Sequence, residues 1–241
     1  MQHMLSYLRR AVDDYQMIAP GDKIAVGVSG GKDSIMLLAA LKALARFYPN
    51  PFTLQAITID MGFENADFSA ITAFCESIEV PHTVVKTDIA PIIFDIRKET
   101  NPCALCAKMR KGALNEAALS LGCKKVALGH HNEDVIETFF LSLFYEGRMH
   151  CFSPVTYLDR TGVTLIRPLI YAPESLVRST VKRLELPIQK NPCPADGNTK
   201  RQEAKEMVNE WEHKDRGFKE RIFTAIQRSG MDGWTKTKGE K

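Results

Sequence analysis

Short apolar runs rich in β-branched residues alternate along the chain with longer stretches in which apolar residues recur every three or four positions. The short runs are typical of buried strands, and the longer stretches are typical of amphipathic helices. Strands are predicted at residues 23–28, 52–60, 82–88, 125–129 and 163–169, and helices at residues 33–48, 66–78, 107–121, 133–145 and 173–184. This alternation predicts an α/β fold with an open parallel sheet and helices on both faces, in a single domain.

The two ends of the chain are expected to add helices to this core. Residues 1–19 have an amphipathic pattern that predicts an N-terminal helix, so the α/β domain is expected to span residues 20–198. Residues 199–241 predict a charged helical extension with a loose tail from residue 233 onward. In an open sheet, right-handed crossovers bring the loops that follow the strands to one edge, where ligands bind. The candidate chemistry of this chain falls in those loops or close to them.

Composition narrows the class of protein. The chain has 241 residues, of which 44% are hydrophobic and 25% charged, as is ordinary for a globular protein. It has neither a run of about 18 apolar residues nor the apolar core of a secretion signal, so we expect a cytoplasmic protein without a membrane span. A net charge of +3 does not by itself indicate nucleic-acid binding. The six cysteines favour metal binding or reactive thiols over a disulfide framework.

A glycine-containing loop joins the first predicted strand to the helix that follows it. Successive glycines let backbone N–H groups converge on an anion, and the helix N-terminus adds partial positive charge. The spacing matches neither the Walker A loop nor the dinucleotide-binding fingerprint. The loop therefore predicts a phosphate site of another kind. Its candidate nucleotide contacts are Ser29, Gly30, Gly31, Lys32, Asp33 and Ser34.

Acidic residues follow two other predicted strands. Asp60 ends the second strand, and we expect it to reach the ribose or adenine of a nucleotide, with a turn-forming role as the alternative. Gly129 ends the fourth strand at the same edge, and Glu133 and Asp134 open the next helix. Their carboxylates suit Mg²⁺ on phosphates, whereas capping of the helix is the alternative role. We expect Asp134 to be a catalytic residue.

Three of the cysteines stand in loops or at a helix start. Cys103 and Cys106 lie three residues apart where a helix begins, and the helix dipole favours their thiolates. Cys193 lies in a loop braced by prolines. Three cysteine ligands suit a 4Fe-4S cluster with one open iron, with zinc as the competitor. Cys75 lies on an apolar helix face and is expected in the core.

The motif SGGKDS resembles the PP-loop of the N-type ATP pyrophosphatases, which cleave ATP to AMP and pyrophosphate. Together with CALCAKMRKGAL, LGHHNEDVIETFFLSLFYEG, IRPLIY and CPADGNTKR, it resembles the tRNA 2-thiocytidine synthetase (TtcA) family over about residues 20–205. The family pattern has two aspartates where this chain has Glu133 and Asp134. The resemblance implies an adenine nucleotide alpha hydrolase-like fold, a tRNA substrate, ATP with Mg²⁺, and a 4Fe-4S cluster held by Cys103, Cys106 and Cys193.

The resemblance also implies the reaction. A pyrimidine C2 carbonyl of tRNA, expected to belong to a cytidine, is adenylated, and a sulfur nucleophile then displaces AMP. Cys193 is expected to be catalytic as well as a cluster ligand, and a cysteine desulfurase or another donor is expected to supply the sulfur. We keep a homodimer as a hypothesis. The alternatives are a lysidine-type synthetase, which joins an amine to cytidine, and a non-catalytic metal-binding redox protein.

Overall fold

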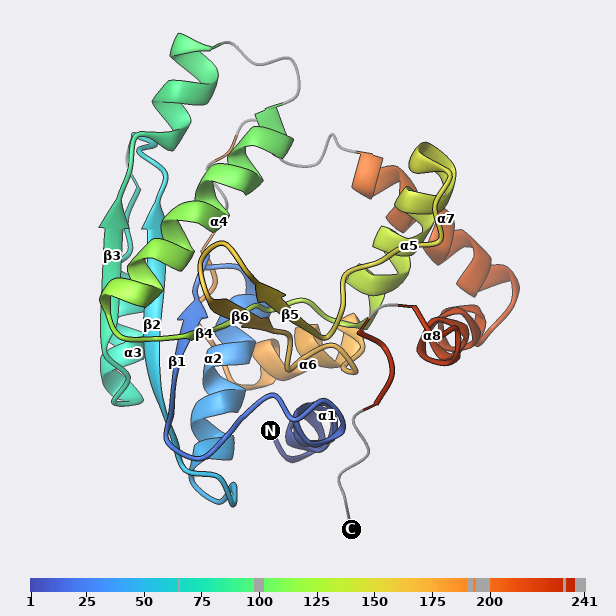
Figure 1. The fold of residues 1–241 in the computed structure, drawn as a ribbon, viewed down its shortest axis with the longest axis horizontal. Helices are drawn as coiled ribbons and strands as arrows, with labels where there is room; N and C mark the ends of the chain where they lie inside the picture. The colour runs from blue at the N-terminus through green and yellow to red at the C-terminus, as the bar shows by residue number, and fades with distance from the viewer. Residues whose placement is uncertain (65, 98–101, 190–192, 194–199, 232, 237–241) are drawn as a thin grey trace.

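A six-stranded sheet with the order β3-β2-β1-β4-β6-β5 forms the centre of the protein in a computed structural model (Figure 1). The structure describes residues 1–64, 66–97, 102–189, 193, 200–231 and 233–236. Five strands run parallel, as predicted. They are β1 (Asp22–Gly27), β2 (Phe52–Asp60), β3 (His82–Lys86), β4 (Lys125–Ala127) and β6 (Val163–Ile166).

The sixth strand, β5 (Val155–Leu158), was not predicted, and it pairs antiparallel with β6 at the edge of the sheet. A tight turn joins the two strands, in which the Gly162 N–H donates to the Leu158 carbonyl at 2.8 Å and Gly162 has a φ of 69°. A left-handed residue in such a turn favours glycine. The fold class is therefore confirmed, whereas the expectation of a purely parallel sheet is wrong at this edge.

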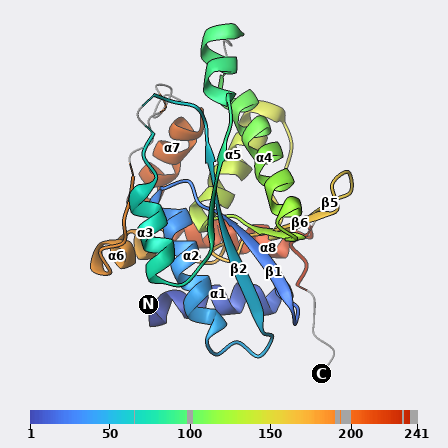
Figure 2. The ribbon, with the colours of Figure 1, turned by 90° about the vertical axis from the view of Figure 1, so that its left-hand side faces the viewer.

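Helices cover both faces of the sheet, as Figure 2 shows. On one face lies α4 (Pro102–Ser120), whose Leu114 and Ala118 pack with Ala25 and Ile57 of the strands. The opposite face is covered by α2 (Lys32–Ala45), α3 (Ser69–Ser77) and α6 (Glu174–Arg183), with α1 (Gln2–Asp14) packed against α2. Because strand side chains alternate between faces, neighbouring residues of β1 enter two separate apolar cores.

The segment before α4 departs from the predicted pattern. It contains a turn of π-helix, η1 (Pro91–Ile96), which the apolar pattern did not indicate. The helix itself begins at Pro102, five residues before its predicted start at residue 107. A proline fits the first turn of a helix because the missing N–H has no partner there. Cys103 and Cys106 consequently lie in the first turns of α4 rather than in front of it.

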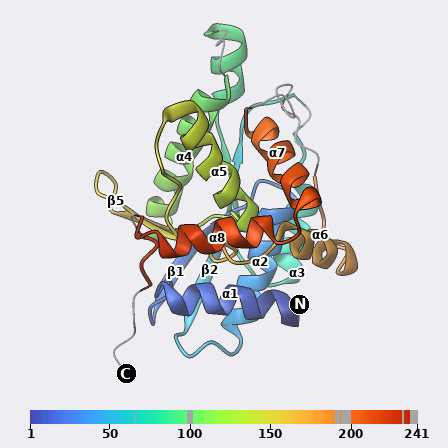
Figure 3. The ribbon, with the colours of Figure 1, turned by 90° about the vertical axis from the view of Figure 1, so that its right-hand side faces the viewer.

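The C-terminal extension folds back onto the domain. It comprises α7 (Lys200–Lys214) and α8 (Phe218–Arg228), which pack against α5 (Asn132–Glu146), and α8 runs between α1 and the α5–α7 pair (Figure 3). Trp234 is 1% exposed and packs edge-on against Tyr15 and Phe223. The expectation of a loose tail from residue 233 is therefore wrong at its start, and residues 237–241 lie outside the described part. No helix of the described residues has the length and apolar character needed to cross a bilayer.

Candidate nucleotide and cysteine site

The loop between β1 and α2 is held closed by its own serines. Gly31 is the N-cap of α2, and Gly30 has a φ of 81°, a backbone conformation that favours glycine. The Ser34 hydroxyl donates to the Gly31 carbonyl at 2.9 Å and accepts from the Ser29 N–H at 3.1 Å. The two serine hydroxyls lie 3.2 Å apart. The loop thus presents backbone N–H groups and hydroxyls at the start of a helix, as a phosphate site requires.

A cavity of about 530 Å³ lies beside this loop, at the carboxyl ends of β1, β2 and β4. Six of the predicted nucleotide or catalytic residues line it, namely Ser29, Asp33, Ser34, Asp60, Gly129 and Asp134. Gly30, Gly31 and Lys32 are not among the described lining residues. Sequence reasoning missed other parts of the wall, including Thr58, Phe63, Phe68, Leu114 and Gln189. Leu114 ends the CALCAKMRKGAL motif, whereas the other four belong to no motif and only the tertiary structure brings them to the cavity.

Gly129 permits a close approach between β4 and the first turn of α2. A Cβ atom at this position would lie 2.9 Å from the carbonyl carbon of Asp33 and 3.0 Å from the backbone nitrogen of Ser34. Backbone atoms cannot rotate away as a flexible side chain can, so only glycine fits without displacing the phosphate loop. This close approach explains why glycine is needed at position 129, and contact of Gly129 with a nucleotide stays a prediction.

Asp60 lines the cavity and also forms a turn. Its Oδ1 accepts a hydrogen bond from the Gly62 N–H at 2.9 Å, and its backbone carbonyl accepts from the Thr87 hydroxyl at 2.7 Å. The turn-forming role considered for this residue is therefore observed, and its contact with a nucleotide stays a prediction. The turn fixes the position of the carboxylate at the end of β2, where a nucleotide can reach it.

Asp134 caps α5 and also faces the cavity beside the phosphate loop, which we call the nucleotide cavity. Its Oδ2 accepts from the His131 N–H at 2.9 Å, as part of a capping box. Burial raises the pKa of Asp134, but the positive charges of His131, His130 and Arg201 lower it by more than burial raises it, so the net shift is downward. The residue is thus an anion at neutral pH, as an Mg²⁺ ligand must be.

His131 lies among three carboxylates. Its ring nitrogens are 3.4 Å from Glu133 Oε2, 3.5 Å from Asp134 Oδ2 and 3.8 Å from Asp33 Oδ1, ion-pair rather than hydrogen-bond distances. Burial lowers the pKa of His131, but the carboxylates outweigh burial and raise it overall. Burial lowers the pKa of His130, which lines the cavity, to about 4. The pair therefore favours one charged and one neutral imidazole near pH 6.5, because one pKa rises and the other falls.

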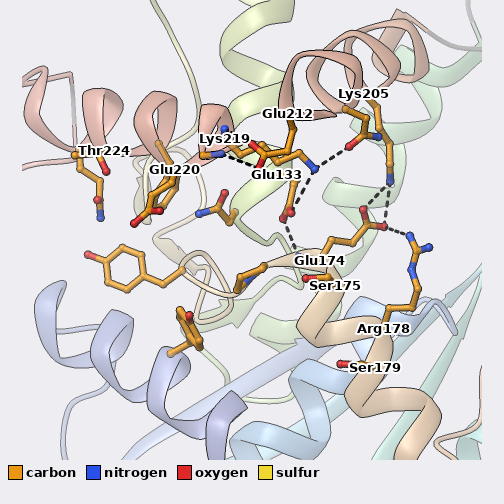
Figure 4. Close-up of a pocket in the computed structure, with 18 of the residues that line it drawn as sticks. Glu133, Glu174, Ser175, Arg178, Ser179, Lys205, Glu212, Lys219, Glu220 and Thr224 are labelled. Carbon is orange, nitrogen blue, oxygen red and sulfur yellow. Dashed lines mark hydrogen bonds and ion pairs between the residues drawn. The ribbon is translucent and has the colours of Figure 1, made fainter. Parts of the chain in front are cut away.

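Glu133 turns away from the nucleotide cavity. Its Oε2 accepts from the Glu174 N–H at the start of α6 at 2.8 Å, and its Oε1 lies 3.8 Å from Lys219 Nζ (Figure 4). Glu133 is also absent from the described lining of the nucleotide cavity. Of the two adjacent acids considered for Mg²⁺, only Asp134 faces the cavity.

Gln189, which precedes Cys193 in the sequence, contacts the phosphate loop. The Gln189 N–H donates to the Gly30 carbonyl at 2.9 Å, and Gln189 lines the cavity four residues before Cys193. Arg110 of α4 lines the same cavity. Gln189 and Arg110 therefore connect the nucleotide cavity to the two segments that carry the candidate cysteine ligands.

Cys106 lies close enough to Cys103 and Cys193 for their charges to change its pKa. Burial raises the pKa of Cys106, Arg110 lowers it, and the charges of Cys193 and Cys103 raise it, with a net shift upward. All six cysteines are among the described residues, and none forms a disulfide. In the described part of the chain, no three His, Cys, Asp or Glu side chains are arranged closely enough to hold a metal ion. The three cysteine thiols are chemically suitable ligands for a metal centre that prefers thiolates. For all three to bind one centre, their sulfurs would have to approach one another.

The other three cysteines are buried, at 0% exposure for Cys75 and Cys123 and 3% for Cys151. The core position predicted for Cys75 is thereby confirmed. Burial raises the pKa of Cys75 and of Cys151 to about 11. Such thiols remain protonated at neutral pH, and this is unfavourable for metal binding or nucleophilic attack.

Glu137, one turn after Asp134, is predicted to make stability depend on pH. Burial and Asp134 raise the pKa of this carboxyl to about 7, from an ordinary value of 4.5. Below pH 4.5 the Glu137 carboxyl is protonated in both the folded and the unfolded protein, so it does not change stability. Above pH 7 it is ionised in both states, and the buried charge destabilises the folded state. Glu137→Gln should therefore stabilise the protein at pH 8 relative to wild type by on the order of 1–3 kcal/mol, and not at pH 4.

Urea unfolding of both proteins at the two pH values measures this difference. Glu210→Gln on α7, where the side chain is exposed, is the control and should change stability little at either pH. A gain for Glu137→Gln that is equal at pH 4 and pH 8 would contradict the assignment.

Comparisons with known proteins agree with this geometry. Residues 4–210 match a family model described as a PP-loop domain. The tRNA-cytidine(32) 2-sulfurtransferase of Dechloromonas aromatica is 35% identical over 233 residues, covering 94% of this chain and 81% of the relative. The corresponding protein of Pelobacter propionicus is 39% identical over 206 residues, covering 84% and 77%. The U34-tRNA thiolase NcsA of Methanococcus maripaludis, solved with its 4Fe-4S cluster, superposes with a TM-score of 0.78 at 25% identity, covering 95% of this chain and 78% of that one.

Proposed function

Since the chain belongs to the PP-loop family of the tRNA-cytidine(32) 2-sulfurtransferases, we propose that it is an ATP-dependent enzyme that thiolates a cytidine of tRNA. The resemblance predicted from the sequence motifs is thereby confirmed. The observation that carries the proposal is the hydrogen bond from the Gln189 N–H, four residues before Cys193 in the sequence, to the Gly30 carbonyl of the phosphate loop. Nucleotide activation and sulfur transfer need to occur next to each other, and a contact of this kind supports that arrangement.

The first half of the reaction uses the nucleotide cavity. The cytidine C2 carbonyl oxygen attacks the α-phosphate of ATP, which forms an adenylate and releases pyrophosphate. The N–H groups and hydroxyls of residues 29–34 stabilise the negative charge that develops on pyrophosphate, and Mg²⁺, which Asp134 would hold, would supply further positive charge there. Asp60, fixed by its turn, lies where the ribose or adenine can be bound. His131 is a close neighbour of Asp33 and Asp134, and these carboxylates favour its charged form beside the phosphate loop.

The second half uses the cysteines. We propose Cys103, Cys106 and Cys193 as the ligands of a 4Fe-4S cluster, which when bound would supply a place for the sulfur that displaces AMP. Arg110 lies between the two parts, because it lines the nucleotide cavity and lowers the pKa of Cys106. It therefore favours the thiolate form that a metal ligand needs.

Partners and location follow from the proposed chemistry. The substrate is tRNA, and the sulfur comes from a cysteine desulfurase or another donor. Tests start with cytidine 32, which the relatives' names specify. We propose a cytoplasmic enzyme, and a homodimer remains a hypothesis to be tested by its mass in solution.

The alternative functions make different predictions. A lysidine-type synthetase would consume an amine rather than sulfur, and its chemistry does not require three cysteines. A non-catalytic redox protein would not convert ATP to AMP. Purified protein with tRNA, Mg²⁺ and ATP should produce AMP, and tRNA nucleosides from cells lacking the gene should lack 2-thiocytidine in mass analysis. Normal 2-thiocytidine in those cells would refute the proposal.

Asp134→Asn is predicted to slow adenylate formation. It keeps the size of the side chain but removes the charge that faces Mg²⁺ or the α-phosphate, so pyrophosphate release should fall at least about tenfold. Asp159→Asn is the matched control, because it makes the same substitution at an exposed position in the turn between β5 and β6. Normal pyrophosphate release by Asp134→Asn would mean that this residue only caps α5.

A further inference from the structure

A second cavity, of about 1200 Å³, opens between α1, α6, α7 and α8 (Figure 4). Two buried carboxylates line it, Glu133 at 7% and Glu174 at 8% exposure. Buried carboxylates are retained in proteins when they are paired, so their partners indicate their role. One partner of Glu174 comes from the phosphate loop.

Glu174, the first residue of α6, binds cations from three different segments. Its carboxylate lies 3.0 Å from Lys32 Nζ, 3.0 Å from Lys205 Nζ and 3.2 Å from Arg178 Nη2. Its N–H donates to Glu133, so the position of its backbone is also fixed. Burial raises the pKa of Glu174, but Lys205 and Lys32 lower it to about 2 overall. Glu174 is therefore an anion at neutral pH.

Lys32 is the lysine of the phosphate loop, yet its ammonium binds Glu174, which lines the second cavity. Its Nζ lies 2.9 Å from Asp33 Oδ2 and 3.0 Å from Glu174 Oε1. Among the described residues that line the nucleotide cavity are its neighbours Asp33 and Ser34, but not Lys32 itself. A triphosphate in that cavity would compete with Glu174 for the ammonium, because both offer charge-assisted hydrogen bonds.

Glu174 keeps other counter-ions when Lys32 moves. Lys205 and Arg178 bind the same carboxylate from α7 and α6. Breaking a buried ion pair is unfavourable mainly because it leaves one charge unpaired. With two cations remaining, the exchange of Lys32 from carboxylate to phosphate avoids that cost.

We propose that Glu174 is a positioning residue of the ATP site, which holds the Lys32 ammonium by an ion pair and releases it to the triphosphate when ATP binds. The inference rests on the proposed ATP-dependent function. Because Lys205 lies on α7, which follows the segment of Cys193, the same carboxylate connects the phosphate loop to that helix.

The test is a double-mutant cycle on the full chain, with binding of α,β-methylene-ATP and Mg²⁺ measured by calorimetry. Glu174→Gln removes the charge that competes for Lys32, so the analogue should bind about fivefold more tightly. In a Lys32→Gln background the same change should have no effect. Adenosine, which lacks phosphates, should bind equally to wild type and Glu174→Gln. A residue with a merely structural role could only weaken binding when replaced.

Glu220→Gln is the matched control, because Glu220 of α8 lines the same cavity and is exposed. It should change affinity by less than about twofold. Unchanged or weaker binding by Glu174→Gln, or an equal gain in the Lys32→Gln background, overturns the inference.

Two further results are decisive. Should Glu174→Gln fail to fold, Glu174→Asp, which is shorter by one methylene, has to show a gain that depends on Lys32. Failure of the wild-type protein to bind the ATP analogue at all refutes the proposed function and the inference with it. Binding by wild type without any change in the variants refutes the inference alone.

Discussion

Replacing Cys193 by serine is expected to lower tRNA thiolation at least about 100-fold while ATP binding stays within about threefold of wild type. A serine hydroxyl is not a thiolate and does not replace a cluster ligand. Cys103→Ser and Cys106→Ser should behave alike, because the three thiols act as one site. ATP binding should persist because the phosphate loop, Asp60 and Asp134 are unchanged.

Thiolated nucleosides in tRNA, measured by mass spectrometry, report the activity, and iron and sulfide per chain after anaerobic reconstitution report the metal. Cys123→Ala is the matched control, since Cys123 follows the opposite end of α4 from Cys103 and is buried in the core. It should reduce stability without reducing thiolation per folded molecule. Stoichiometric zinc with full activity and no iron would contradict the cluster, and full activity of Cys193→Ser would remove this residue from the site.

Gly129→Ala is expected to slow adenylate formation by about 100-fold, because catalytic groups displaced by about 1 Å lose activity on this scale. The added methyl group would lie 2.9 Å from backbone atoms of Asp33, and the phosphate loop would have to shift to accommodate it. Pyrophosphate release with tRNA present measures the rate, and calorimetry with an ATP analogue measures affinity.

Gly112→Ala provides the matched substitution. Gly112 lies within α4, and nothing lies within 4 Å of the position where its Cβ would be. Alanine there should leave activity unchanged and stabilise the helix by up to about 1 kcal/mol. Equal rates for Gly129→Ala and wild type would show that the loop tolerates displacement and that its geometry does not limit catalysis.

The order of strands and helices could be predicted from the sequence because it depends on local periodicity. The strand at residues 52–60 was predicted at its observed bounds, and each predicted core helix was found. The edge strand β5 was missed, because the hydrogen bonds that define it all come from its partner β6. Trp234 lies in a polar tail by sequence, and its burial depends on Tyr15 at the other end of the chain.

The α/β fold and the phosphate loop could be predicted from the sequence because each depends on residues close together along the chain. The three candidate cysteine ligands include Cys193, far from Cys103 and Cys106, and the set was identified by the family motifs. The tertiary structure decided which neighbours face which cavity. Asp134 and Glu133 are adjacent, yet only Asp134 faces the nucleotide, since successive helix residues point about 100° apart. The pairing of Lys32 with Glu174 joins residues 142 positions apart (174 − 32), and packing of α6 against α2 brings them together. No local pattern encodes such a contact, because it depends on how whole elements pack.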